Sequence, residues 1–420
     1  WRAAQRATAA RPAIPRRGGF SRGAIRSRTA ERPLSAPQRW LLAVVLAGTL
    51  TSCAPEAHPA PLPATPPMGW SSWNKFGCAI DESTVRQHAD ALVATGMARA
   101  GYEYVNVDDC WMAPERDAAG RLQADPSRFP SGIEALADYV HARGLKFGLY
   151  QSAGRLTCQK LPGSLDHEVS DAQTFADWGV DLLKYDNCSN EGRPAQERYG
   201  AMAQALAGTG RQVALVICDW GDSRPWTWAR GVGAAAWRTY GDIADTWDSM
   251  LAVVDHQVGL ESFSGPGGWN DPDSLQVGNG GMTDEQYRAQ LSMWAVLNAP
   301  LIAGNDLRAM DTATRELLTN AAVLEVNQDW GGQQGRRVLS DGPREVWAKP
   351  MSTGDAAVVL LNRGEAAQEI SITPTELGLP DATIYAMRDL WTGSLEFGTT
   401  VSAQVPGRAA ALVLVAPPGT

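Results

Sequence analysis

Aspartates recur through the middle of this 420-residue sequence, several of them near tryptophans, and could act together chemically. The segments that contain them are Asp108-Asp109-Cys110-Trp111, Lys184-Tyr185-Asp186, Asp219-Trp220, Trp237-Arg238 with Asp242, and Trp269-Asn270-Asp271-Pro272-Asp273. Glycoside hydrolysis uses two carboxylates around an oxocarbenium-like transition state. Further acids can accept hydrogen bonds from sugar hydroxyls, and Trp offers a flat apolar face to a sugar ring. One such Asp alone is more often a turn former, but together these residues favour glycoside hydrolysis.

Asp186 and Asp242 are the two aspartates that we predict to carry the reaction. Lys184 and Asp186 are two residues apart on a predicted strand, so both side chains point to one face, where the ammonium group would keep Asp186 ionised for nucleophilic attack. The alternative for this pair is a structural ion pair. Asp242 lies in a loop four residues after Arg238, and neighbouring carboxylates would favour its protonated form. Because Arg238 would instead favour the ionised form, we expect Arg238 to orient the sugar or the nucleophile.

The elements that must position these residues alternate between short apolar runs and amphipathic stretches over residues 68–332. The predicted strands are Gly69–Trp73, Tyr102–Asp108, Leu145–Tyr150, Leu182–Asp186, Val213–Cys218, Ala234–Tyr240, Gly268–Leu275 and Ala299–Ala303. The clearest predicted helices are Glu82–Arg99, Gly132–Arg143, Asp171–Trp178, Ala195–Ala207 and a closing helix at Arg315–Val326. This alternation predicts an α/β fold, a (β/α)8 TIM barrel whose active site lies where the strands end. A doubly wound sheet is the alternative, but the first strand lacks the Gly-rich phosphate loop typical of one.

Residues 333–420 follow a different pattern and predict a C-terminal antiparallel β-sandwich. The apolar runs there are short, several contain β-branched residues, and Gly, Pro and Asn separate them. The predicted strands are Val346–Ala348, Ala356–Leu361, Glu369–Ile372, Thr383–Met387 and Ala410–Val415.

Charge is divided unevenly along the chain. Residues 1–40 contain ten Arg and one acidic residue, Glu31, which leaves 27 Lys and Arg against 45 Asp and Glu in the remainder. A strongly acidic globular part argues against nucleic acid and anionic membrane surfaces as partners, since both favour clustered positive charge.

The front of the chain predicts export. A basic stretch precedes the apolar run Trp40–Leu50, and Leu50-Thr51-Ser52-Cys53 resembles a bacterial lipobox, so we expect residues 1–53 to be a signal or lipobox region with Cys53 as a lipid anchor. Plain secretion is the alternative. Residues 54–67 are rich in Pro and Ala and predict a linker. The protein is thus expected to be secreted or anchored to the outside of a bacterial cell envelope, with membrane contact only through the lipid.

Six cysteines, at positions 53, 78, 110, 158, 188 and 218, fit an exported protein. We propose the disulfides Cys78–Cys110 and Cys158–Cys188, each worth roughly 3–4 kcal/mol on the loop-entropy model, with Cys218 as a buried free thiol. A metal site is the alternative. The sequence contains no Cys-x-x-Cys pair and only five His, so we expect neither a metal nor an organic cofactor.

The motifs, in order and spacing, resemble the α-galactosidase (melibiase) family, glycoside hydrolase family 27. The segments that carry this resemblance are Met68–Asn74, Asn106–Trp111, Lys184–Cys188, Trp237-Arg238 with Asp242, and Gly265–Asp273, within a match from about Thr65 to Trp330. The family carries a β-sandwich tail, and its disulfides match the two pairs proposed above. The resemblance implies a retaining α-galactosidase that hydrolyses terminal α-D-galactosyl residues by double displacement.

The resemblance also implies a role for each matching residue. Asp186 would be the nucleophile and Asp242 the acid/base. Asp108 and Asp109 would hold the galactose 4- and 6-hydroxyls, and Lys184 and Arg238 would hold ring hydroxyls near the nucleophile. Trp73, Tyr150 and Cys158 would line the pocket, and we predict Asp271 as a further substrate ligand. The two catalytic carboxyl groups should lie about 5–5.5 Å apart, as retaining enzymes require.

One segment departs from the family pattern. Many members read Cys-Glu-Trp where this chain reads Cys218-Asp219-Trp220, a segment implied to face the C2 substituent of the sugar. An acid and a bulky ring there favour a free 2-hydroxyl over an N-acetyl group. The alternatives are a β-L-arabinopyranosidase, which the Asp108 and Asp109 pair disfavours because two short acids leave room for C6, and a non-catalytic sugar-binding lipoprotein on the same barrel.

Overall fold

The structure is a computed structural model that describes residues 63–329 and 331–418. The predicted signal or lipobox region, the proposed lipid anchor Cys53 and the first part of the predicted linker lie outside the described residues. Within the described part, no helix has the length and apolar character needed to cross a membrane.

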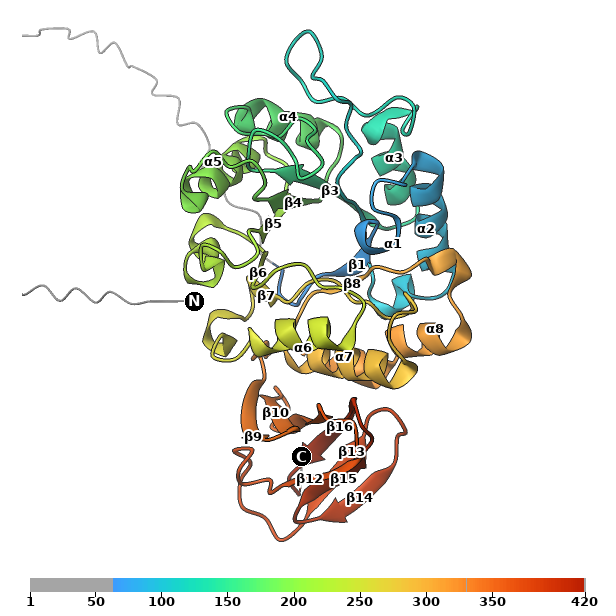
Figure 1. Cartoon of the computed structure of the whole chain (residues 1–420), viewed down its shortest axis with the longest axis vertical. Coiled ribbons are helices and arrows are strands. Elements are labelled where there is room, and N and C mark those ends of the chain that lie inside the picture. The colour runs from blue at the N-terminus through green and yellow to red at the C-terminus, as the bar shows by residue number, and fades with distance from the viewer. Residues whose placement is uncertain (1–62, 330, 419–420) are drawn as a thin grey trace, which may run out of the picture. The chain divides into compact units, whose positions relative to one another are not determined.

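Parallel strands form a curled sheet at the centre of the described residues, in the order β7-β6-β5-β4-β3-β2-β1-β8 (Figure 1). The strands are β1 (Met68–Ser71), β2 (Tyr104–Val107), β3 (Lys146–Ser152), β4 (Leu182–Asp186), β5 (Ala214–Cys218), β6 (Ala236–Arg238), β7 (Trp269–Asp271) and β8 (Leu301–Ala303). A parallel bridge between Leu275 and Ala303 brings the two ends of the sheet together. The sheet is therefore a closed eight-stranded barrel, and the predicted (β/α)8 fold is confirmed.

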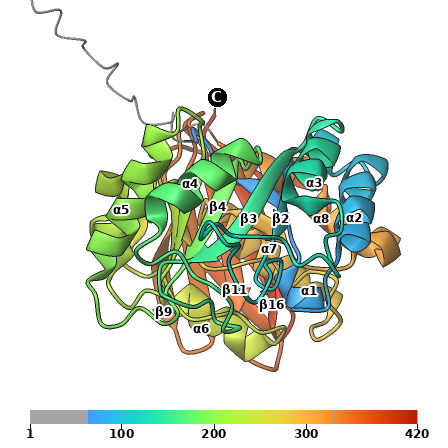
Figure 2. The same ribbon diagram turned by 90° about the horizontal axis from the view of Figure 1, so that it is seen from above.

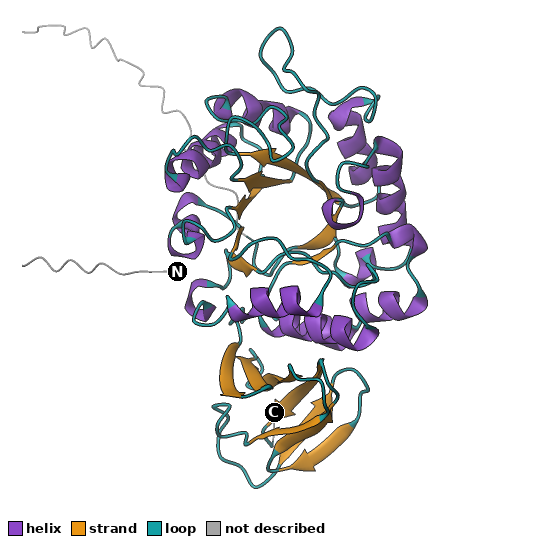
Figure 3. Cartoon of the chain, viewed as in Figure 1, coloured by secondary structure: helices purple, strands orange, loops and turns teal. Residues whose placement is uncertain are grey.

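Helices surround the barrel strands (Figure 3). They are α1 (Trp73–Phe76), α2 (Glu82–Ala94), α3 (Gly132–His141), α4 (Glu168–Asp177), α5 (Ala195–Gly208), α6 (Trp247–Asp255), α7 (Asp284–Val296), α8 (Thr312–Leu318) and α9 (Ala321–Asn327). In Figure 2, α2–α5 lie along the outside of β2–β4. The apolar residues of these helices pack on the outer face of the strands, so the catalytic face of the barrel is built mainly by loops.

Two predicted helices are shorter than the sequence pattern indicates. The helix predicted at Glu82–Arg99 ends at Ala94, because Gly96 adopts a left-handed backbone with φ +88°. The helix predicted at Arg315–Val326 is divided into α8 and α9. The division falls at Asn320, whose side chain accepts hydrogen bonds from the amides of Ala322 and Val323 and so begins a new helix.

An antiparallel β-sandwich follows the barrel, as predicted. Its larger sheet has the order β14-β13-β16-β11-β10-β9, and β12 pairs with β15. The strands are β9 (Arg336–Asp341), β10 (Arg344–Pro350), β11 (Ala356–Asn362), β12 (Gln368–Ile372), β13 (Tyr385–Asp389), β14 (Leu395–Gly398), β15 (Val401–Val405) and β16 (Ala409–Ala416). The sequence pattern does not predict β9, β14 and β15 as strands. Both β9 and β14 are edge strands whose side chains are largely exposed, so neither shows a strong apolar signal.

Helix α7 packs against both the barrel and the sandwich. Its central residues from Ala289 to Val296 are all buried, and it contacts β16 and β11 of the sandwich as well as α8 and α9 of the barrel. Trp391 of the sandwich donates a hydrogen bond to Ser292 at 3.0 Å. A helix that is covered on all sides lacks the one-sided apolar pattern that identifies surface helices, so the sequence analysis did not find it among the clearest helices.

The last residues of the predicted linker are bound to the barrel. The Pro63 carbonyl accepts a hydrogen bond from the Gly267 amide, the Pro66 carbonyl from the Gln328 side chain, and the Pro67 carbonyl from the Leu301 amide. Residues 63–67 thus lead directly into β1 as part of the folded domain.

Candidate active site

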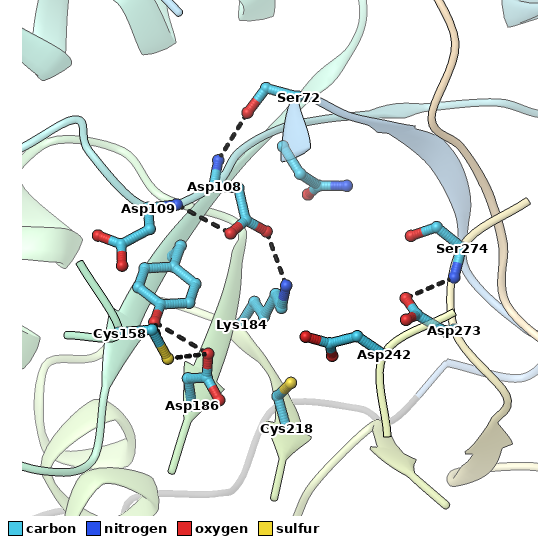
Figure 4. A network of polar contacts seen from close by, with 12 residues as sticks. Ser72, Asp108, Asp109, Cys158, Lys184, Asp186, Cys218, Asp242, Asp273 and Ser274 are labelled. Carbon is cyan, nitrogen blue, oxygen red and sulfur yellow. Dashed lines mark hydrogen bonds and ion pairs between the residues drawn. The ribbon is translucent and has the colours of Figure 1, made fainter. Parts of the chain in front are cut away.

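A cavity of about 490 Å³ opens at the carboxyl ends of the barrel strands. The predicted site residues that line it are Trp73, Asp108, Asp109, Tyr150, Cys158, Lys184, Asp186, Arg238 and Asp242. They come from the ends of five different strands and the loops that follow, which is where TIM barrels carry their active sites. Both of the carboxylates predicted to act on the substrate therefore face one space (Figure 4).

Asp108 and Lys184 form an ion pair across the floor of the cavity. The Asp108 Oδ2 and Lys184 Nζ atoms are 2.7 Å apart, and Asp108 Oδ1 accepts a hydrogen bond from the Asp109 amide at 2.9 Å. Burial alone would lower the pKa of Lys184, but Asp108 and the neighbouring acids outweigh it and hold that pKa well above its ordinary value. Lys184 was expected to pair with Asp186. Lys184 instead contacts Asp108, the residue after β2. Its positive charge therefore acts on both Asp108 and Asp186.

Asp109 is held by the backbone of two different loops. Its Oδ1 accepts from the Cys110 amide at 2.7 Å, and its Oδ2 accepts from the Gln159 amide at 3.0 Å. Burial raises the pKa of Asp109. Because carboxylate oxygens can accept more than one hydrogen bond, Asp108 and Asp109 keep the capacity to bind sugar hydroxyls in a fixed orientation.

Asp186 ends β4 with only 5% of its surface exposed. Its Oδ1 accepts a hydrogen bond from the Asn187 amide at 2.8 Å, and its Oδ2 accepts one from the Tyr150 hydroxyl at 2.9 Å. Burial raises the pKa of Asp186 to about 6, although Lys184, the Asn187 amide and Tyr150 act in the opposite direction. Asp186 is therefore a carboxylate fixed in one rotamer and ionised at neutral pH.

The predicted disulfides Cys78–Cys110 and Cys158–Cys188 are both present, and Cys218 is a buried free thiol. The Cys158 sulfur lies 3.2 Å from Asp186 Oδ2 and forms part of the cavity wall. Cys158, Asp186 and Cys188 are grouped closely enough to resemble a metal site. Since the two sulfurs are bonded to each other, neither is the thiolate that a metal would require.

Asp242 lies in the loop after β6, and its side chain is 64% exposed. Within the described part of the chain, its one hydrogen-bonding partner is Arg238, whose Nη2 lies 3.1 Å from Asp242 Oδ1. Arg238 is 3% exposed, and burial, which would lower its pKa, is outweighed by Asp273 and the other surrounding acids, so that its pKa lies above the ordinary value. Asp242 is thus an exposed carboxylate held by a buried partner.

Asp219, Trp220 and Asp271 are not among the residues that line this cavity, and their role as substrate ligands stays a prediction. Asp219 is fully buried, and its carboxylate accepts from the amides of Gly221 and Ser223 and from the Ser223 hydroxyl, which fixes its own turn. Asp271 lines a separate space of about 60 Å³ inside the barrel, and its Oδ1 accepts from the Asp273 amide at 2.8 Å. Burial raises the pKa of Asp271 to about 6.

Most tryptophans of the motifs serve the core. Trp111, Trp237 and Trp269 are fully buried, and Trp237 donates a hydrogen bond to the Asn270 side chain at 2.6 Å. Among the described tryptophans, Trp73 is the one that lines the cavity. Of these tryptophans, Trp73 is thus the one placed where it could stack on a sugar ring, and that role stays a prediction.

The cavity also has lining residues that the predicted site did not include: one at the end of β1, two in α1 and the rest in the loops after β6 and β7. They are Ser71, Asn74, Lys75, Ile243, Ala244, Asp245, Asp273, Ser274, Gln276 and Asn279. Asp273 could have been found, because it closes the last carboxylate segment at the end of a barrel strand. Ser71 and Asn74 belong to the Met68–Asn74 motif but were given no role there, and the residues from the loops after β6 and β7 reach the cavity only through the path of those loops.

A (β/α)8 barrel with buried and exposed carboxylates around one cavity is an arrangement that suits glycoside hydrolysis. Two family models agree: one described as alpha galactosidase A matches residues 65–329, and one described as the alpha galactosidase C-terminal beta sandwich domain matches residues 341–415. The chain belongs to the α-galactosidase (melibiase) family, glycoside hydrolase family 27, and its activity is that of an α-galactosidase.

Known relatives match over most of their length. An α-galactosidase of Cyamopsis tetragonoloba is 50% identical over 357 residues, which cover 84% of this chain and 86% of that protein. Alpha-galactosidase A of Cellvibrio japonicus is 43% identical over 381 residues, covering 85% and 93% of the two chains. The crystal structure of α-galactosidase I from Mortierella vinacea superimposes with a TM-score of 0.81 at 35% identity, covering 85% of this chain and 98% of that one.

Proposed function

We propose that Asp186 attacks the anomeric carbon of a terminal α-galactosyl residue while Asp242 protonates the departing oxygen. A covalent galactosyl-enzyme forms, and Asp242 then removes a proton from the water that releases galactose with its configuration retained. The carrying observation is that Asp186 is held by Tyr150 and the Asn187 amide at the wall of the same cavity that Asp242 lines.

The contrast between the two carboxylates supports this assignment of roles. A nucleophile must be ionised and correctly aimed, and the hydrogen bonds on both oxygens of Asp186 favour its ionised form. An acid/base must reach the leaving oxygen and then water. Asp242, on a loop and with most of its side chain exposed, can do both.

We infer that the floor of the cavity binds the galactose ring. Asp108, Asp109 and Lys184 offer buried, oriented charges to its hydroxyls, and Trp73 offers an aromatic face at the rim. Rates on nitrophenyl α-galactoside, nitrophenyl α-N-acetylgalactosaminide and nitrophenyl β-L-arabinopyranoside test the preference. We expect the first substrate to be fastest, and faster hydrolysis of the arabinoside would contradict it.

The roles of the two aspartates can be tested by trapping the intermediate. Asp242→Asn treated with dinitrophenyl α-galactoside should form the galactosyl-enzyme, because this leaving group needs no proton, and should release it slowly. Peptide mass spectrometry should then locate the galactosyl group on Asp186. Labelling at another residue, or a first-formed product of inverted configuration by NMR, would contradict the proposal.

We also propose that the enzyme acts outside the cytoplasm, held by lipid on Cys53. The support is the lipobox-like sequence together with two disulfides, which persist in oxidising compartments. Mass spectrometry of the mature N-terminus should find a lipidated Cys53, and Cys53→Ser should release the protein from the membrane fraction. An unmodified Cys53 in the mature protein would contradict the anchor.

A further inference from the structure

Asp273 is a cavity residue that the mechanism above does not use. It follows β7 and lies beside Asp242 (Figure 4). One of its oxygens, Oδ2, accepts a hydrogen bond from the amide of Ile243 at 2.9 Å and lies 2.9 Å from Arg238 Nη2. Its other oxygen accepts from the Ser274 amide at 2.7 Å. A single carboxylate thus contacts both the residue next to Asp242 and the guanidinium group that contacts Asp242.

The Arg238 guanidinium group is shared between two acids. The same Nη2 atom contacts Asp242 Oδ1 at 3.1 Å and Asp273 Oδ2 at 2.9 Å. A positive charge given wholly to Asp242 would favour its ionised form, yet the first chemical step needs Asp242 protonated. Asp273 is 12% exposed whereas Asp242 is 64% exposed. The more buried acid is therefore the better partner for the arginine.

Other charged or titratable groups also surround Asp242. Those that line the cavity or the space beneath Arg238 are Asp108 and Asp109 after β2, Tyr150 on β3, Lys184 and Asp186 on β4, Cys218 on β5, Asp271 on β7, Asp245 in the same loop as Asp242, and Lys75 on α1. Lys184 is already paired with Asp108. Asp245 accepts hydrogen bonds from Tyr287 and the Gly281 amide. Of the described groups, Arg238 and Asp273 are thus the charges most directly coupled to Asp242.

We propose that Asp273 is a positioning residue for the proton transfer: it takes a share of the Arg238 charge and fixes the backbone at Ile243, so that Asp242 can hold a proton and deliver it to the leaving oxygen. This inference rests on the acid/base role proposed for Asp242. Asp273 acts through Arg238 and Ile243 and exchanges no proton itself.

The backbone around Asp273 is shaped for this contact. Asp273 has a φ of +90°, in the left-handed region where Asp and Asn are among the better tolerated residues with a side chain. The carboxylate of Asp271 accepts a hydrogen bond from the Asp273 amide at 2.8 Å and holds this turn. The buried acid that was predicted to touch substrate therefore supports Asp273.

Asp273→Asn is the sharpest test, because it removes the charge, keeps an oxygen that can accept from the Ile243 amide, and suits the left-handed backbone. The pH dependence of kcat/KM is measured for the full enzyme with melibiose, whose sugar leaving group needs a proton, and with dinitrophenyl α-galactoside, which does not. In the Asp273→Asn variant, Arg238 is left with Asp242 as its charged partner and should favour the ionised form of Asp242. We expect the high-pH limb for melibiose to move down by about one unit or more, with little change for the dinitrophenyl substrate.

Two further variants separate charge from structure. Asp248→Asn removes one negative charge from an exposed position in the first turn of α6, where no contact with Arg238 is made, and the high-pH limb of this variant should not move. Asp273→Ala, which also loses the acceptor for Ile243, should be slower than Asp273→Asn on melibiose. Circular dichroism and thermal melting establish that each variant is folded.

The inference is overturned if Asp273→Asn leaves the high-pH limb in place, or if it slows both substrates equally, which would indicate a direct sugar contact. Failure of the acid/base assignment would look different. In that case Asp242→Asn would hydrolyse melibiose at the wild-type rate, whatever the result for Asp273.

Discussion

The two sides of the active-site cavity are built in opposite ways. On the side of β2–β4, the carboxylates of Asp108, Asp109 and Asp186 are all buried, and each accepts at least one backbone amide hydrogen bond. A disulfide at Cys158 closes that side. On the side of β6 and β7, Asp242 projects from a loop, largely exposed, with Arg238 as its hydrogen-bonding partner in the described chain.

This difference separates two demands of the chemistry. A nucleophile reacts faster when it is held in one geometry before the substrate binds, because the entropy cost of orienting it is then met during folding. A proton donor must serve two steps at two positions, first the leaving oxygen and then a water molecule, and a rigid setting would favour one over the other. In the proposed mechanism, the buried side binds the sugar and supplies the nucleophile, and the exposed Asp242 transfers protons.

The largest effect should come from removing the fixed carboxylate. Asp186→Asn keeps the shape but cannot form the covalent bond, so we expect kcat to fall on the order of 10⁴-fold or more for every α-galactoside. Steady-state rates on melibiose and dinitrophenyl α-galactoside measure this. Substantial activity on the dinitrophenyl substrate would place the nucleophile elsewhere.

Removing the mobile carboxylate should have a smaller and substrate-dependent effect. Asp242→Asn should lower kcat/KM for melibiose by about 10²–10⁴-fold. The loss in the first step should be much smaller for dinitrophenyl α-galactoside, because that leaving group departs without a proton. Equal losses on both substrates would mean that Asp242 is not the proton donor.

The Tyr150 hydroxyl should influence both the reactivity and the pKa of Asp186. Tyr150→Phe removes the hydrogen bond to Asp186 Oδ2, and we expect kcat/KM to fall about ten-fold, since hydrogen bonds to charged groups are the stronger ones. In the wild type, the Tyr150 hydroxyl favours the ionised form of Asp186. Removing this hydroxyl should therefore raise the pKa of Asp186 above its value of about 6. The low-pH limb of kcat/KM should then move to higher pH. A limb that stays in place would show that Tyr150 has no influence on Asp186.

The two disulfides can be compared directly, because they close loops of similar length and one of them contacts Asp186. Their sequence separations are 30 and 32 residues, so replacing either pair by Ser should reduce the free energy of unfolding by a similar amount, about 3–4 kcal/mol. Only Cys158 contacts Asp186. We therefore expect the Cys158→Ser, Cys188→Ser variant to lose kcat several-fold, while the Cys78→Ser, Cys110→Ser variant keeps it. Chemical denaturation and initial rates measure the two effects, and an equal loss of kcat in both would remove the local role of Cys158.

The smallest effect concerns stability. The pKa of Asp186 is raised to about 6 in the folded protein, so the folded state binds this proton more tightly than the unfolded chain does. Proton binding at Asp186 therefore stabilises the folded state fully below about pH 4. This stabilisation, up to about 3 kcal/mol, is lost as the pH rises through about 6. Asp186→Asn should gain stability relative to wild type as the pH increases over that window. Melting curves at about pH 4 and about pH 7 test this, and a constant difference between the two proteins would contradict it.

The sequence was most informative where local pattern and chemistry coincide. The strand Leu182–Asp186 has the predicted bounds, because an apolar run that ends in charged residues marks the point where a buried parallel strand reaches the rim. The predictions were less accurate where burial comes from distant partners. Helix α7 is covered by both domains, and β14 lies at an exposed edge, so neither has a one-sided apolar pattern.

The sequence by itself determined the barrel, the sandwich, the disulfide pairs and the identity of the two facing aspartates, because each depends on periodicity or on motifs short enough to read along the chain. Only the tertiary structure decided how the charges are shared. It pairs Lys184 with Asp108, turns Asp219 and Asp271 toward backbone amides, and brings Asp273 to Arg238. A carboxylate takes the partner that lies nearest in three dimensions, and which partner is nearest depends on how neighbouring strands and their loops pack.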